Sequence, residues 1–218
     1  MMTHEQYRAK MESEGDWAPG WDAISAVFEG LYPGIKEEHF GTILTSRAVF
    51  GGPEYLDGYS LYRSPKGHKH LVTYGMSSLY AEPEELGGEF SGWGYEMTFK
   101  LSDDGDHIWA MNMLGNLARY TYTQQRWFEP LQFVAGDGSP IKQGADSLIS
   151  SLIVVEDTEA TGMDTLHGRV DFLQMVGITW QECQAIMDDR EKIPALVEAM
   201  KRDNPLLVTD LNRTKQYL

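Results

Sequence analysis

The sequence predicts an α+β fold: a single domain with a mixed, mostly antiparallel β-sheet flanked by helices. Three observations carry this prediction. The chain has 218 residues, of which 42% are hydrophobic, enough for one substantial core. Segment 92–101 alternates large apolar side chains with small or polar ones, as a strand does. Several other apolar segments are interleaved with stretches of helical spacing, and no linker or repeat divides them.

Two helices are expected near the N-terminus. Thr3 and Gln6 have the spacing of a capping box, which predicts a short polar helix over residues 5–14. Apolar residues at helical spacing predict a second helix over residues 21–31. Because its apolar residues form a single stripe, we expect this helix to lie on the sheet.

Three strands are expected next, over residues 42–50, 59–62 and 70–74, separated by glycine and proline turns. His68 and His70 stand two residues apart, so they would face one side of a strand, as a pair of metal ligands can. No nearby third ligand has convincing spacing. We therefore expect no metal site here.

Segment 92–101 is expected at the centre of the sheet, with Trp93 and Tyr95 on an aromatic face and smaller, polar residues on the other. Glu96 belongs to the polar face. A buried carboxylate without a partner is costly, so Glu96 should bind Arg119 or backbone amides. We favour this structural or partner-orienting role over catalysis, which would need a histidine or metal that the sequence does not place.

The C-terminal half should alternate helices and strands. Thr179 and Glu182 form a second capping box, which marks the start of one of the helices. The expected elements are a helix from Trp109, a strand from Phe133, strands over 148–155 and 169–176, helices from Thr179 and over 193–201, a final strand over 206–209, and a polar loop over 157–167.

Charge and composition exclude several classes of function. The formal net charge of −15 at pH 7 argues against direct nucleic-acid binding, which needs a basic face, and against binding to anionic membranes. The single cysteine excludes a disulfide within the chain and a thiolate metal cluster. No phosphate-binding glycine motif occurs, so we expect no cofactor. Without a signal peptide or an apolar membrane-spanning window, the expected location is cytoplasmic.

Two acidic segments bracket the central strand, and we expect them to share one edge of the sheet. A field of one sign there would steer a basic protein partner toward the domain. The alternative is that both loops are merely solvated. The acidic residues are Glu82, Glu84, Glu85 and Glu89 before the strand and Asp103, Asp104 and Asp106 after it.

Segment 92–101, Gly-Trp-Gly-Tyr-Glu-Met-Thr-Phe-Lys-Leu, resembles the glycine-aromatic signature of suppressor of fused proteins. Further segments similar to blocks of that family follow in the same order. They are residues 19–24, 51–58, 70–80, 117–120, 172–178 and 206–211. The resemblance covers about residues 19–213, so we expect one suppressor-of-fused-like domain over residues 1–218, with its core at about 19–213.

The resemblance implies a protein-binding module without catalysis. Animal members hold a short peptide of a transcription factor as an added strand between two lobes, and this chain resembles the first lobe only. Their Tyr-Gly-Asp, part of the peptide-binding region, reads Tyr80-Ala81-Glu82 here. Bacterial relatives are proposed as immunity proteins for polymorphic toxins. The resemblance thus implies a domain that neutralises a toxin, such as a basic one, or another protein, by strand addition or surface masking.

The alternative is an enzyme or small-ligand-binding protein with a pocket near Glu96 and Tyr95. A deep polar pocket at Glu96 would favour this alternative, and an open acidic or edge-strand surface would favour partner binding. No catalytic, cofactor-binding or metal-binding residues are expected. The candidate partner-binding residues are Tyr80, Glu82, Glu84, Glu85, Trp93, Tyr95, Glu96, Asp103 and Asp104.

Overall fold

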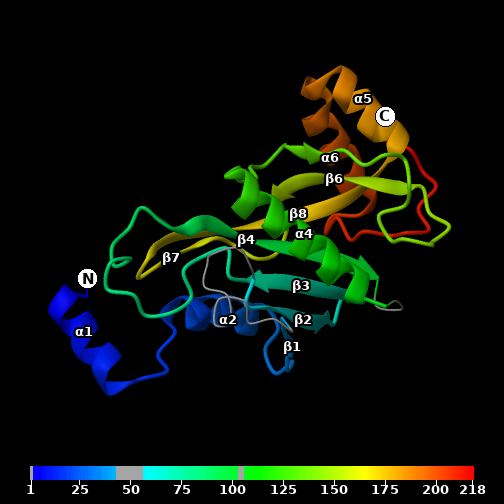
Figure 1. The fold of residues 1–218 in the computed structure, drawn as a ribbon. Helices are drawn as coiled ribbons and strands as arrows, with labels where there is room; N and C mark the ends of the chain where they lie inside the picture. The colour runs from blue at the N-terminus through cyan, green and yellow to red at the C-terminus, as the bar shows by residue number, and fades with distance from the viewer. Residues whose placement is uncertain (1, 43–55, 103–105) are drawn as a thin grey trace.

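The structure, a computed structural model, describes residues 2–42, 56–102 and 106–218. Helices alternate along this part of the chain with the strands of one large sheet (Figure 1). The strands are β1 (Glu38–Gly41), β2 (Gly58–Ser64), β3 (His68–Tyr74), β4 (Phe90–Ser102), β5 (Phe133–Val134), β6 (Ile149–Glu156), β7 (Met163–Thr165) and β8 (Gly168–Thr179). The helices are α1 (His4–Ser13), α2 (Pro19–Leu31), α4 (Ile108–Gln124), α5 (Trp180–Asp188) and α6 (Ile193–Asp203), with a 3₁₀ turn η1 (Arg190–Lys192).

The described strands form an eight-stranded sheet in the order β1-β2-β3-β4-β8-β6-β5, with β7 paired to β8. The β4–β8 pair is parallel, and the other strand pairs are antiparallel. β4 lies at the middle of the order, between β3 and β8. The predicted α+β class and the central place of this strand are therefore confirmed.

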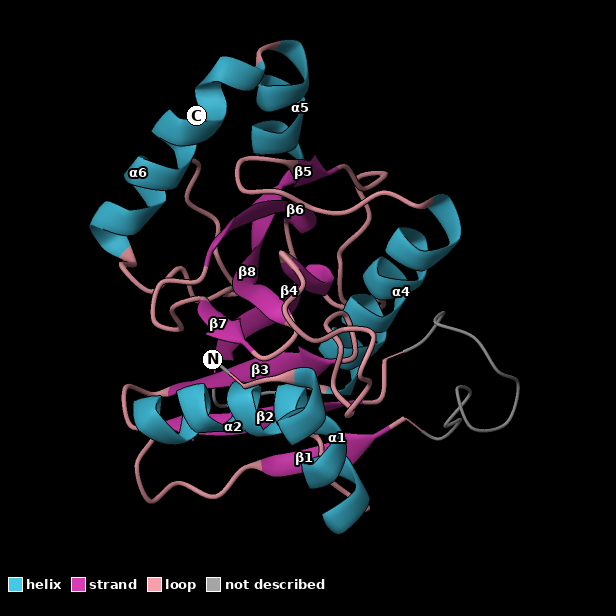
Figure 2. Cartoon of the chain, turned by 90° about the vertical axis from the view of Figure 1, so that its left-hand side faces the viewer, coloured by secondary structure: helices cyan, strands magenta, loops and turns pink. Residues whose placement is uncertain are grey.

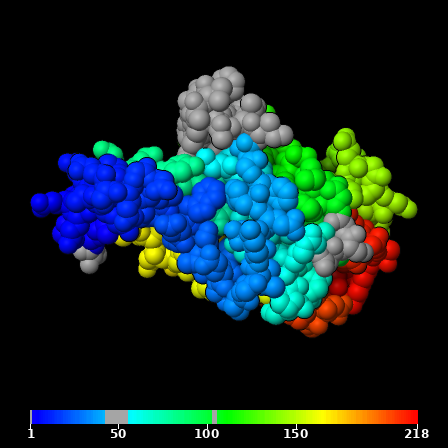
Figure 3. All heavy atoms as spheres, turned by 90° about the horizontal axis from the view of Figure 1, so that it is seen from below, coloured from blue at the N-terminus to red at the C-terminus, as the bar shows by residue number. Residues whose placement is uncertain are grey.

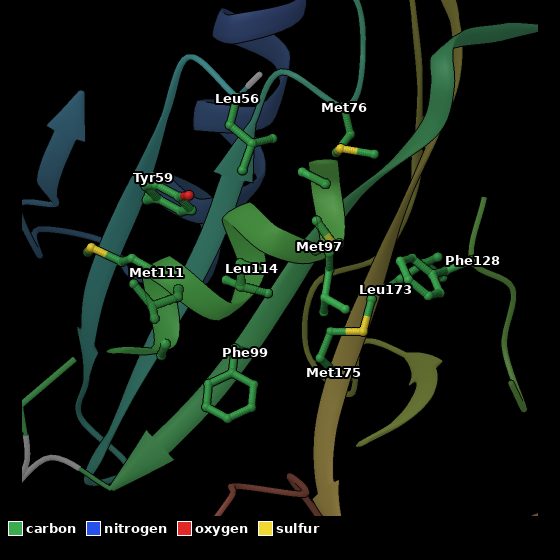
Figure 4. Packing of buried hydrophobic residues seen from close by; sticks show 14 of the residues in the cluster. Leu56, Tyr59, Met76, Met97, Phe99, Met111, Leu114, Phe128, Leu173 and Met175 are labelled. Atoms are coloured by element: carbon green, nitrogen blue, oxygen red, sulfur yellow. The ribbon is translucent and has the colours of Figure 1, made fainter. Parts of the chain in front are cut away.

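Helix α4 covers one face of the sheet. Met97 and Phe99 of β4 point toward Leu114 of α4, with Leu173 and Met175 of β8 beside them (Figure 4). All five side chains are buried. Alternation along β4 brings its large apolar residues to this face together, so the sequence pattern predicts the packing directly.

Helix α2 and the α5–α6 pair cover the opposite face at its two ends (Figures 1 and 2). The alternation of β8 shows this arrangement. Phe172 contacts the ring of Phe28 of α2 edge-on, with centroids 5.4 Å apart, and Val176 packs in the α5–α6 cluster. Both residues alternate with Leu173, which faces α4.

Several predicted elements differ from the structure. Strands β1 and β7 were not expected, and β7 lies within the predicted polar loop. The predicted strand over 206–209 is wrong: it forms a single bridge, between Leu101 and Thr209. Leu207 has a φ of 50°, a left-handed conformation that interrupts an extended strand. The strand predicted over 42–50 lies mostly outside the described residues.

Candidate functional site

The polar face of β4 is an interior face. Glu96, Thr98 and Lys100 are all buried to 0% exposure. Because the buried charges must be compensated inside the protein, this face organises the polar groups of the domain. Glu96 and Lys100 meet two different sets of partners.

Glu96 accepts hydrogen bonds from the segment that leaves β3. The backbone amides of Gly75, Met76 and Ser77 donate to its carboxylate at 3.1, 3.3 and 2.9 Å. The hydroxyls of Thr73 and Ser77 add bonds of 2.7 and 2.6 Å. Burial raises the pKa of Glu96 to about 7, although these hydrogen bonds lower it. Of the two expected kinds of partner, backbone amides bind Glu96, and Arg119 lies exposed on α4.

Glu96 therefore fixes a chain segment rather than a substrate. The segment it holds continues to Leu79, whose carbonyl accepts hydrogen bonds from Gly20 and Trp21 at 3.0 and 3.3 Å. These are the first amides of α2, which lack partners within the helix. Glu96 thereby couples the central strand to the start of α2.

Lys100 is the cation of a second buried group. Its Nζ donates to Asp157 Oδ1 at 3.0 Å and to Thr158 Oγ1 at 2.6 Å, and it lies 3.1 Å from Glu159 Oε2. Burial alone would raise the pKa of Asp157, but His70, Lys100 and Thr98 outweigh it and hold that pKa well below its usual range. The same balance, with Lys66 and Lys100 as the main partners, lowers the pKa of Glu159 to about 2.

No third ligand was expected near His68 and His70 in the sequence, but the structure brings one to them from a distant segment. Glu159 lies 91 residues beyond His68, yet its Oε2 is 3.1 Å from His68 Nε2. The ligand atoms of these three residues lie within 4.8 Å of one another. Lys100 already contributes the positive charge there, and a metal ion would have to displace it. His68, His70, Lys100, Asp157 and Glu159 together form an internal ion cluster.

His70 extends that cluster to α2. Its Nε2 is 2.9 Å from Asp157 Oδ2, and its Nδ1 is 2.8 Å from the hydroxyl of Tyr32, the residue after α2. Sequence spacing could not reveal this arrangement, because Tyr32, His70 and Asp157 come from three distant segments.

The predicted partner-binding residues separate into exposed and buried ones. Tyr80 is 43% exposed, and its hydroxyl donates to Asp57 at 3.1 Å. Glu82 and Glu84 are exposed, and Glu85 is half-buried and accepts from Ser78 Oγ. These positions are accessible to a partner protein. Asp103 and Asp104 lie outside the described residues.

Trp93 and Tyr95 lie on the α4 face of β4. Trp93 is half-buried, edge-on to the ring of Tyr122 with centroids 5.7 Å apart. Tyr95 is buried, and its hydroxyl is 3.0 Å from Thr121 Oγ1. Trp93 and Tyr95 do not line a common pocket with Glu96, because the alternation of β4 places Glu96 on the opposite face of the sheet.

The two acidic segments do not share an edge of the sheet. Glu89 directly precedes β4, and Asp106 lies beyond its other end. β4 has 13 residues. At about 3.3 Å per residue, its ends are roughly 40 Å apart. Among the described residues, Glu89 and Asp106 therefore do not form one joint acidic field; Asp103 and Asp104 lie outside the described residues.

An open groove borders the start of β4. Its volume is about 550 Å³, and its apolar lining comes mainly from aromatic side chains. Glu129 and Asp171 add carboxylates to this lining. The apolar lining residues are Phe90, Trp93, Trp127, Phe128, Pro130 and Leu173.

A second groove of about 680 Å³ lies on the other side of Trp127 and shares residues 127–129 with the first. Phe90, Trp127 and Leu131 have exposed fractions of 55, 56 and 46%. We call the exposed and half-buried apolar residues of both grooves the Trp127 surface. It consists of Phe90, Trp93, Tyr120, Trp127, Pro130 and Leu131.

The backbone around Trp127 has unusual geometry. Gln125 and Leu131 have φ values of 54° and 67°, a region that side chains other than glycine rarely enter. Gln125 is the C-cap of α4, where a left-handed residue is common, whereas Leu131 lies in a loop and its conformation costs about 1–3 kcal/mol. Sequence reasoning missed this surface. The available signal was the pair Trp127-Phe128 within a polar stretch, and it does not reveal a left-handed backbone.

Among the described residues, no helix combines the length and apolar character needed to cross a membrane.

Comparison with known proteins identifies relatives of this chain. Residues 52–214 match the family model described as Suppressor of fused protein (SUFU). The human and mouse proteins described as Suppressor of fused homolog are each 29% identical over 211 residues, which cover 89% of this chain and 43% of each relative. The chain thus spans less than half the length of the curated relatives it matches.

Solved structures agree with this result. The structure described as the Sufu-Fu complex matches with a TM-score of 0.78 and 25% identity, over 92% of this chain and 93% of that one. Drosophila Suppressor of Fused matches with a TM-score of 0.77 and 25% identity, over 92% of this chain and 51% of that one. A putative SUFU homolog from Neisseria gonorrhoeae shares the fold, with a TM-score of 0.59 at 15% identity, over 91% of this chain and 97% of that one.

The family model covers most of the chain, and the resembling segments 19–24, 70–80, 92–101, 117–120 and 172–178 lie in α2, β3 and the residues after it, β4, α4 and β8. This chain belongs to the suppressor of fused family.

Proposed function

We propose that this chain is a non-catalytic domain that binds a partner protein on the Trp127 surface. The observation that carries the proposal is the gathering of exposed aromatic and apolar side chains around Trp127. Exposed apolar patches of this kind mark interaction sites, and tryptophan and tyrosine are enriched at binding hot spots. One structural relative is described in a complex, the Sufu-Fu complex.

The buried charges support binding over the alternative of an enzyme or small-ligand protein with a pocket at Glu96. Catalysis needs titratable groups that reach a substrate. Glu96, Lys100 and Asp157 are each fully buried at the side chain and bound to internal partners. None of the three lines either groove of the Trp127 surface.

The finer proposal is an immunity protein that neutralises a toxin by masking its surface. It rests on the proposals made for bacterial members of the family and on charge. The two grooves at Trp127 have a mixed charged lining, with Glu129 and Asp171 beside Arg126 and Arg190. The net charge of −15 favours a basic protein partner and disfavours nucleic acid and anionic membranes.

The acidic loop before β4 extends this proposed binding region. Tyr80, Glu82, Glu84 and Glu85 are accessible, and the chain then leads to Phe90, which lines the groove. A partner seated against Trp93 and Phe90 would meet these carboxylates at its rim.

The test is the affinity of the purified partner for the parent and two variants. Trp127→Ala removes a central side chain, and a hot spot of this type should weaken binding about 30-fold or more. Ile108→Ala is the matched control: Ile108 is 49% exposed at the first residue of α4, at the opposite end of that helix from Trp127. The 17 residues of α4 put about 25 Å between the two ends.

The control should bind as the parent does. If both variants bind like the parent, the Trp127 surface is not the docking site. If a catalytic activity appears that Glu96→Gln abolishes, the non-catalytic proposal fails as a whole.

A further inference from the structure

Helix α1 is joined to the domain through one inserted side chain. Tyr7 is 0% exposed, whereas every other residue of α1 is exposed or half-buried. The helix projects at one end of the molecule (Figures 1 and 3). Its ten residues are too few for a stable isolated helix in water. The burial of Tyr7 is therefore the main tertiary interaction that α1 makes.

The hydroxyl of Tyr7 forms hydrogen bonds with two groups. The backbone amide of Glu82 donates to it at 3.0 Å. On its other side the hydroxyl is 2.7 Å from His167 Nε2. The tyrosine thus meets one donor and one imidazole nitrogen.

The tautomer of His167 follows from its second contact. Its Nδ1 is 2.9 Å from the carbonyl oxygen of Ser78, which can only accept, so Nδ1 carries the proton. In the neutral ring Nε2 is then an acceptor, and the Tyr7 hydroxyl donates to it. His167 is itself 0% exposed, and its amide donates to Thr165 Oγ1 at 3.1 Å.

The socket therefore matches a phenol in shape and in polarity. One donor and one acceptor converge on a hydroxyl that needs both, and the ring of Trp17 lies 4.9 Å from that of Tyr7. A phenylalanine would fill the space but leave the amide of Glu82 and the buried Nε2 of His167 without their partner, which is costly.

We propose that this socket is a tyrosyl-recognition site, which α1 plugs from within the chain and leaves as a unit when another tyrosine-bearing segment competes. Glu82 and Ser78 belong to the segment between β3 and β4, so release of α1 uncovers a specific site beside the acidic loop. The inference goes beyond the proposed function: the socket adjoins the acidic loop at Glu82, which the proposed binding region includes, but it shares no residue with the Trp127 surface.

Hydrogen exchange of the full chain tests the attachment. Tyr7→Phe removes both hydrogen bonds of the hydroxyl, so it should speed exchange of the α1 amides about tenfold or more, without change in β4. Tyr7→Ala should leave these amides essentially unprotected. Arg8→Ala, at an exposed neighbouring position, is the control and should exchange as the parent does.

The ligand class is tested on Tyr7→Ala with N-acetyl-tyrosinamide as the probe and the indole N–H resonance of Trp17 as the readout. The tyrosine probe should shift this resonance saturably, and N-acetyl-phenylalaninamide should bind at least fivefold more weakly. The parent should respond to neither probe at the same concentration. Adding His167→Ala to the variant should abolish the difference between the two probes.

Equal binding of both probes to Tyr7→Ala would overturn the proposal, as would α1 amides that stay protected in that variant. If Tyr7→Ala does not fold, the exchange of Tyr7→Phe decides: unchanged protection of α1 would contradict the single-anchor attachment.

Discussion

At the residue scale, the polar face of β4 buries charged side chains inside the domain, whereas a few aromatic side chains near Trp127 are exposed. Glu96 and Lys100 lie on the same face of β4, and groups from other segments of the chain compensate the charge of each. Trp127, in contrast, is 56% exposed. This distribution separates the groups that hold the fold from those offered to a partner, and it makes the energetic role of individual side chains testable.

Glu96→Gln should destabilise the domain by about 2–4 kcal/mol at neutral pH, because an amide offers one acceptor oxygen and turns two N–H groups toward existing donors. Urea unfolding measures this loss. Amide exchange should rise first in residues 75–79, which Glu96 holds. Unchanged stability and exchange would show that the five hydrogen bonds contribute nothing.

The buried ion cluster should make stability depend on acid pH. The folded pKa of Glu159 is about 2, below its usual 4.5, so its stabilisation is present above about pH 4.5 and is lost as the pH falls toward 2. We expect the free energy of unfolding to fall by about 1–3 kcal/mol more in the parent than in Glu159→Gln over this range. Parallel pH profiles for the two proteins would refute this role of Glu159.

At the scale of helices and strands, sequence patterns predicted the elements that depend on neighbouring residues alone. The alternation around Met97 identified β4, the stripe of α2 predicted its buried face, and Thr179 caps α5 as a capping box predicts. Strand β7 has three residues and depends on its pairing with β8, so no periodicity could reveal it. The Trp127 surface depends on two left-handed residues and on the meeting of distant segments, which a linear pattern does not encode.

Phe99→Asp should abolish the cooperative thermal transition, because an unpaired carboxylate would enter the packed face between β4 and α4. Tyr120→Asp is the control, since Tyr120 is 42% exposed on α4 and should tolerate the charge. Circular dichroism melting compares the two. A Phe99→Asp protein that melts like the parent would contradict the packing of β4.

At the scale of the whole molecule, the sheet joins three regions with separate roles: the internal ion cluster, the tyrosine socket under α1 and the Trp127 surface. The net charge of −15 acts on all of them as a long-range field. Because the two acidic segments lie at opposite ends of β4, only the one that leads to Phe90 adjoins the Trp127 surface.

This geometry predicts salt-dependent association with a basic partner. Between about 50 and 500 mM salt, the association rate of the parent should fall about tenfold, since screening shortens the reach of the field. A Glu82→Gln/Glu84→Gln variant should be slower at low salt, whereas Glu198→Gln on α6 should match the parent. Stopped-flow mixing measures the rates, and rates independent of salt in all three proteins would exclude steering.

The most direct test of the central claim is the hydrogen-exchange footprint of the bound partner on the full chain. If the Trp127 surface is the docking site, binding should slow exchange in residues 125–134 and 90–95 and leave α2 unchanged. The α2 amides serve as the internal reference, because that helix packs in a cluster that contains no residue of the Trp127 surface. Protection confined to other elements, with residues 125–134 exchanging as in the free protein, would contradict the account.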